Sequence, residues 1–173
     1  MRQMTTQIHA PALPMQRRML LALGALPLAA LLPVGARAHH GWSSFDQGRP
    51  LYLEGKAAAV QWRNPHAELT LERTPKLALP ADLASRSVPA QSAAVDGPGL
   101  LARAELPTRN DPRWTIELAP LTRLQAWGVP QIHPGEDIAV LGFSFSGEKG
   151  DAVLRAEYLW LGGKVYGMRS SPA

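Results

Sequence analysis

The sequence predicts an all-β fold, a small five-stranded barrel of the OB type with one short helix between strands three and four. Five segments after residue 50 carry the patterns of strands, and one helical segment lies between the third and the fourth of them. No internal repeat interrupts this order. Three strands, a helix and two further strands are typical of such a barrel in a domain of this size.

The first two strands are expected on either side of a turn. Residues 51–62 have heavy apolar side chains near both ends, and Gly55 with the small alanines between them indicates a bend or close packing. The turn follows at residues 63–65 (RNP). Residues 67–73 (AELTLER) alternate between apolar and polar side chains, as a half-buried strand does.

Residues 74–112 differ from the rest of the domain. They are rich in Pro, Ala, Ser and Gly and show little periodicity, apart from a short helical pattern near residues 82–85. We therefore expect a long, disordered or mobile insertion that the fold can do without.

Regular patterns return after the insertion. Residues 113–118 alternate Trp, Ile and Leu with polar side chains, and Pro120 begins a short helix that runs to Trp127 before Gly128 ends it. The remaining strands are expected as a hairpin of residues 137–145 and 152–161, with a short addition at residues 164–166.

The N-terminal segment has the features of an export signal. The pair Arg17-Arg18 precedes an apolar run over residues 19–32, and Ala36-Arg37-Ala38 supplies the small residues of a signal-peptidase site. The run is shorter than the roughly 20 residues of a membrane-spanning helix, so stable membrane insertion is not expected. We expect residues 1–38 to be a signal peptide of the twin-arginine type, handled by the export machinery and signal peptidase, and residues 39–173 to be a periplasmic domain.

Charge and cysteine content narrow the possible functions. The net charge of +4 comes entirely from four arginines that precede His39, since no acidic residue lies there. The mature domain therefore carries equal numbers of acidic and basic residues, which argues against a nucleic-acid partner. The absence of cysteine excludes disulfides, thiolate metal sites and a cysteine nucleophile.

Several short motifs of the mature domain form a recognisable set. They are HHGW at residues 39–42, FD at 45–46, WRNPH at 62–66 and PGE at 134–136. This set resembles an uncharacterised family of small exported bacterial proteins with an Ala-His-His mature start, a W-x-N-P-H motif and a final strand pair after Pro-Gly-Asp/Glu. The resemblance spans the mature chain except for residues 74–112. It implies the OB-like fold and the exported location, and it implies no reaction.

Cleavage after Ala38 would make His39 the first residue, and a terminal histidine can chelate one metal ion through two nitrogens. Its α-amino group has an unperturbed pKa of about 7.7–8.0 and its imidazole one of about 6.5, so both lose their protons near neutral pH. One more imidazole would complete a T-shaped set of three nitrogens, which suits Cu(II). The arrangement is similar to the histidine brace of exported copper proteins.

His66 is the main candidate for the second imidazole, with His40 in support and His133 as a weaker alternative. If the chain reverses near residues 48–50, the residues that precede this turn from His39 onward, which we call the N-terminal arm, can run back along the first strand. The arm would then bring His39 beside His66. Two plainer interpretations stay open: the terminal histidines are unstructured, or His66 only satisfies backbone groups at the start of a strand.

The sequence thus predicts a periplasmic protein that binds copper through His39, His66 and His40 for storage, delivery or sensing. No nucleophile, paired carboxylates or phosphate-binding loop stand out, so a non-enzymatic role is favoured over a copper oxidase or monooxygenase. The main alternative is a metal-independent binding module for a small molecule, an envelope component or a periplasmic partner protein.

Overall fold

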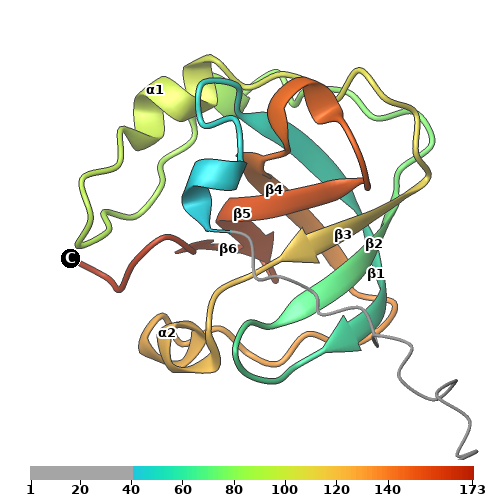
Figure 1. The fold of residues 1–173 in the computed structure, drawn as a ribbon. Helices are drawn as coiled ribbons and strands as arrows, with labels where there is room; N and C mark the ends of the chain where they lie inside the picture. The colour runs from blue at the N-terminus through green and yellow to red at the C-terminus, as the bar shows by residue number, and fades with distance from the viewer. Residues whose placement is uncertain (1–40) are drawn as a thin grey trace, which may run out of the picture. The chain divides into compact units, whose positions relative to one another are not determined.

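The computed structural model describes residues 41–173, whose regular structure is mainly β-strand (Figure 1). No helix in this range is long and apolar enough to cross a membrane. In chain order the elements are η2 (Trp42–Ser44), β1 (Leu51–Gln61), β2 (Glu68–Arg73), η3 (Leu83–Ser85), α1 (Gly97–Ala102), β3 (Arg113–Glu117), α2 (Leu121–Ala126), β4 (Asp137–Phe143), η4 (Ser146–Glu148), β5 (Val153–Leu161) and β6 (Lys164–Gly167).

Five of the strands close into a barrel. β1 pairs antiparallel with both β2 and β4, β2 pairs with β3, and β4 pairs with β5. The barrel closes where β3 runs parallel to β5, with Ile116 opposite Leu154. β6 is an extra strand at the edge of β5. The predicted five-stranded OB-like barrel is confirmed, and α2 is the predicted helix between strands three and four.

The barrel interior is filled by the side chains that the alternating pattern assigns to it. Leu53, Leu71, Trp114 and Ile116 are fully buried there, and Leu124 of α2 packs against them from one end of the barrel. The close packing expected at a glycine of β1 is also present. A β-carbon on Gly55 would lie 1.9 Å from the Glu72 carbonyl oxygen, so only glycine fits.

A second hydrophobic cluster, which we call the outer cluster, lies on the other face of the same strands. Tyr52, Leu141 and Tyr158 belong to it, whereas their chain neighbours Leu53 and Val140 point into the interior. Residues from 74–112 cover this face, including the buried Leu83, Leu100 and Leu101. Figure 1 shows this segment, in green to yellow, running along the side of the barrel.

Buried charges anchor the covering segment to the barrel. Glu148 accepts hydrogen bonds from the Thr108 and Arg109 amides at the end of the segment. In its middle, Gln91 donates to Glu157, a fully buried carboxylate of β5, at 2.8 Å. The mobility expected for residues 74–112 stays a prediction, but their leucines and these anchors belong to the packed structure.

Candidate functional site

His66 lies in the β1–β2 loop, directly after the cis Asn64–Pro65 bond, and is half-buried. Its Nε2 atom is 3.2 Å from Nη2 of Arg155. A guanidinium group can only donate, so Nε2 is the acceptor and a neutral His66 ring carries its proton on Nδ1. The structure thus gives His66 a specific partner, beyond the satisfaction of backbone groups.

Arg155 is a buried arginine at the centre of this region. Its Nη1 donates to Glu117 of β3 at 2.9 Å, and its side chain is only 7% exposed. Burial, followed by the charge of Arg155, lowers the pKa of the nearby Arg123 guanidinium. Positive charge therefore gathers around Arg155, which contacts His66, and Glu117 is the carboxylate that balances part of it.

The start of the described chain is held over the same region by Trp42. The Arg155 guanidinium carbon lies 5.1 Å from the Trp42 ring centre, and that of Arg169 lies 4.0 Å away. Phe143 meets the same ring edge-on at 6.3 Å. Such cation–π contacts each contribute about 0.5–2 kcal/mol, depending on burial. These contacts hold Trp42 against the barrel, and Figure 1 shows the η2 turn, in cyan, beside the strands.

The predicted ligand set cannot be assembled from the described residues. His39 and His40 both lie outside them, so the pairing of either one with His66 is not tested. Residues 41–173 contain no group of three or more His, Asp and Glu side chains placed to hold a metal ion. His133 is exposed in the turn before β4, where its amide donates to Glu136.

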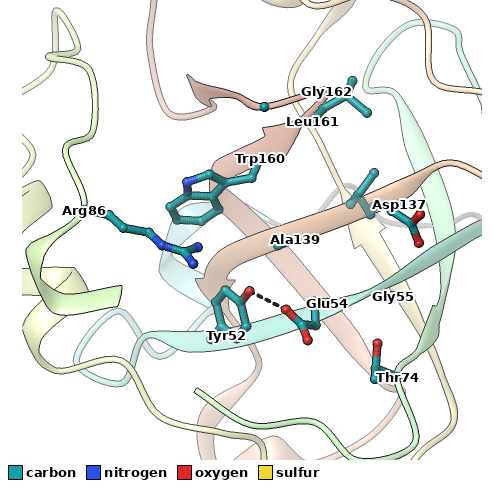
Figure 2. Close-up of a pocket in the computed structure, with 12 residues that line it drawn as sticks. Tyr52, Glu54, Gly55, Thr74, Arg86, Asp137, Ala139, Trp160, Leu161 and Gly162 are labelled. Carbon is teal, nitrogen blue, oxygen red and sulfur yellow. Dashed lines mark hydrogen bonds between the residues drawn. The ribbon is translucent and has the colours of Figure 1, made fainter. Parts of the chain in front are cut away.

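A second candidate region is a hollow of about 380 Å³ on the outer face of β1, β4 and β5 (Figure 2). The strand register explains it. Glu54 of β1 lies opposite Ala139 of β4, which in turn lies opposite Trp160 of β5. A methyl group between two large side chains leaves a gap in the outer face. We call this gap the Ala139 hollow.

The walls of the Ala139 hollow are both aromatic and polar. Figure 2 shows Trp160 and Arg86 on one side of Ala139, with Glu54 and Asp137 on the others. Beneath Trp160, the Tyr52 hydroxyl donates to Glu54 at 2.7 Å. Burial, and next the contact with this carboxylate, raise the pKa of Tyr52, so its hydroxyl keeps its proton.

The sequence alone did not predict this region. Arg86 comes from the segment expected to be mobile, and Trp160 comes from the last strand of the predicted hairpin. The one sequence signal was Ala139, a small residue at an outward position of a strand whose other side chains, apart from Gly142, are larger. A second hollow of about 750 Å³ shares four lining residues with it, namely Asp137, Leu161, Gly162 and Gly163.

Comparison with known proteins supports the resemblance drawn from the motifs. Residues 28–80 match the model of a family of unknown function (DUF6152), a range that includes the HHGW and WRNPH motifs. The similarity to an uncharacterised family is thereby confirmed for this part of the chain. Neither the comparison with curated proteins nor that with solved structures gave a significant match.

Proposed function

We propose that this chain is an exported, periplasmic barrel protein that binds copper through His39 and His66, with His40 in support. The observation that carries the proposal is the anchoring of Trp42 beside the loop that holds His66. Trp42 contacts Arg155, and Arg155 contacts His66, so one side chain links the N-terminal arm to the proposed ligand.

The length of the arm makes the proposed pairing possible. His39 precedes Trp42 by three residues, which span roughly 10 Å when extended. Its amine and imidazole could therefore reach the surroundings of His66, where Arg155 contacts the ring. The short span supports the return of the arm toward His66 that the sequence predicts.

Arg155 competes with copper for the Nε2 atom of His66. It occupies the lone pair of His66 Nε2, which is also a lone pair that copper would use. Binding at Nε2 therefore requires Arg155 to move away, while Glu117 can remain its partner. The positive charge of Arg155 also opposes a cation, so the anionic Glu117 beside it matters for affinity.

The experiment is a Cu(II) titration of protein whose first residue is His39, followed by electron paramagnetic resonance. We expect stoichiometric binding with a type-2 spectrum and nitrogen hyperfine structure. His66→Ala should lower the affinity at least tenfold, because two nitrogens from His39 leave Cu(II) short of its preferred set. His133→Ala is the matched control and should bind as the unchanged protein does.

A second comparison isolates the free amine. Protein that retains Ala38 has every side chain but no terminal amine on His39, and it should lose most of its affinity. Equal affinity for the two forms would reject the brace. Intact-mass measurement of the exported protein tests the location and the cleavage together, because a mature start downstream of His39 would remove the ligand.

The alternative, a metal-independent binding module, is favoured by one specific observation. The Ala139 hollow combines an exposed aromatic edge with fixed polar groups, and none of its lining residues is a histidine. The two functions do not exclude each other, since they use different residues.

A further inference from the structure

We propose that the Ala139 hollow is a binding site for a neutral carbohydrate ring. It shares no lining residue with the His66 region, so the inference does not depend on copper. Its basis is the shape of the gap, the chemistry of its walls and the way those walls are held.

The shape favours a small ring-shaped ligand. A volume of about 380 Å³ lies at the lower end of ligand pockets, which range over about 300–1,000 Å³. Two strand spacings separate Glu54 from Trp160, which is about 10 Å across the sheet. A single flat ring placed over Ala139 would therefore meet the indole of Trp160 on one side and a carboxylate on the other.

The mixture of polar groups favours a ligand without net charge. Glu54 and Asp137 are acceptors, whereas Arg86 is a donor, so an anion and a cation would each meet repulsion. Lys56 pairs with Asp137 at 2.8 Å and balances the second carboxylate. Sugar hydroxyls both donate and accept, and they can satisfy all of these groups together.

The aromatic wall explains how such a polar ligand could gain affinity. Pyranose rings present a face of C–H groups, and an indole ring offers a flat apolar surface against which that face can pack. Trp160 is partly exposed on the rim of the hollow. Its orientation is supported from below, because Tyr52 meets it at 6.4 Å and Tyr158 at 6.5 Å between ring centres.

The polar walls are held in place before any ligand binds. Arg86 donates two hydrogen bonds to Asp82, at 3.0 and 3.1 Å, which fix its guanidinium group. Glu54 is oriented by the Tyr52 hydroxyl, and its carbonyl accepts from the amide of Thr74. Side chains that are already ordered add little entropic cost to binding, which favours both affinity and specificity.

The test is a titration of the exported protein, in the presence of EDTA, with neutral disaccharides such as cellobiose, maltose and chitobiose. Saturation-transfer and amide-shift NMR report the contact, and the Trp160 indole N–H signal reports its place. We expect at least one sugar to bind saturably, with a Kd of about 1 mM, and to shift the Trp160 signal.

Two substitutions locate the contact. Ala139→Leu fills the hollow without removing any polar group and should weaken sugar binding at least tenfold, by about 1.4 kcal/mol. Ala59→Leu, the same change at an exposed position of β1, is the control and should leave binding unaltered. Unchanged thermal melts for both variants would show that the fold is intact.

Other outcomes would overturn the proposal. Adenine tests a planar heterocycle, tetramethylammonium a cation, and inorganic phosphate an anion. Saturable binding of any of these at the Trp160 signal, without binding of a sugar, would reject a carbohydrate site. Absence of binding by the whole sugar panel, or sugar binding that Ala139→Leu leaves unchanged, would do the same.

Discussion

The interior of the barrel and the outer cluster bury side chains of the same strands, but they are covered by different means. Trp114 and Leu154 of the interior and Tyr52 and Leu141 of the outer cluster are all at most 1% exposed. The interior is closed by strand pairing and one helix. The outer cluster is closed by residues 74–112, which have almost no periodic pattern, and by the N-terminal arm.

This difference shows that a segment without periodicity can still be part of the core. Only short pieces of residues 74–112 are helical, namely η3 and α1, yet η3 supplies one buried leucine and α1 supplies two. Its carbonyls and amides also bond directly to the barrel, for example at Glu105, whose carbonyl accepts from the Tyr52 amide. The segment therefore acts as the second layer that an apolar outer face requires.

The largest expected effect comes from removing that layer. The amide of Arg73 donates to the carbonyl of Pro112 at 2.9 Å, so a short Gly/Ser turn could replace residues 75–110 and still join β2 to β3. The sequence suggests that such a deletion is harmless. Because the outer cluster is buried under this segment, we predict the opposite. The deletion should lower the free energy of unfolding by an amount comparable with the whole stability of a domain, about 5–15 kcal/mol. Thermal and urea melts measure it, and a cooperative melt near that of the full domain would contradict it.

A smaller effect is expected from single truncations, which compare the two clusters directly. Leu101→Ala in the outer cluster and Leu154→Ala in the interior should each cost about 2–5 kcal/mol, because both leucines are at most 2% exposed. Leu79→Ala is the matched control in the covering segment. Its side chain is 40% exposed, so we expect a change within about 0.5 kcal/mol. A negligible cost for Leu101→Ala would mean that the outer cluster is loosely packed.

Glu148 provides a prediction that depends on pH. Burial alone would raise its pKa, but hydrogen bonds from Thr108, Arg49 and Arg109 outweigh burial and lower the pKa below the ordinary 4.5. Its contribution to stability is therefore complete above about pH 4.5 and is lost as the pH falls through the lowered value. Glu148→Gln should cost about 1–3 kcal/mol at pH 7, and the difference from the unchanged protein should shrink in acid.

The control for Glu148 is a carboxylate that shares its partner. Glu105 also pairs with Arg49, but its side chain is 57% exposed. Glu105→Gln should therefore cost at most about 1 kcal/mol. Equal costs for the two substitutions at pH 7 would show that burial of Glu148 is not what makes its bonds strong.

The fold could be predicted largely because its strands alternate. Trp114 and Ile116 point inward at a period of two, and the position of α2 follows from Pro120 before it and Gly128 after it. The outer cluster was missed because Arg155 and Glu157 interrupt the apolar run of β5 that a strand buried on both faces usually has. In the structure, nearly every position of residues 153–161 is buried, which is typical of a strand covered on both faces.

The candidate sites could be predicted only in part. The WRNPH motif drew attention to His66, but its contact with Arg155 joins residues far apart in the sequence. The Ala139 hollow depends on the register of three strands, and a slip by one residue would turn Ala139 to the interior. Register between distant strands is not encoded in any local pattern, so the small side chain of Ala139 was not enough by itself to predict this hollow.

Apart from the control substitutions, the smallest expected effect on stability concerns the N-terminal arm, the other cover of the outer cluster. Trp42 is only partly buried and contributes two cation–π contacts, so Trp42→Ala should cost about 1–2 kcal/mol, less than Leu101→Ala. Trp42→Phe keeps a weaker aromatic face and should cost less still.

If the arm delivers His39 to His66, Trp42→Ala should also weaken Cu(II) binding more than its effect on the melt explains. Sugar binding at the Ala139 hollow should stay unchanged, because the arm does not line it. If Trp42→Ala lowered stability as much as Leu101→Ala does, the arm would be part of the core. If Trp42→Ala left the copper affinity unaltered, the arm would not position His39 for the proposed metal site.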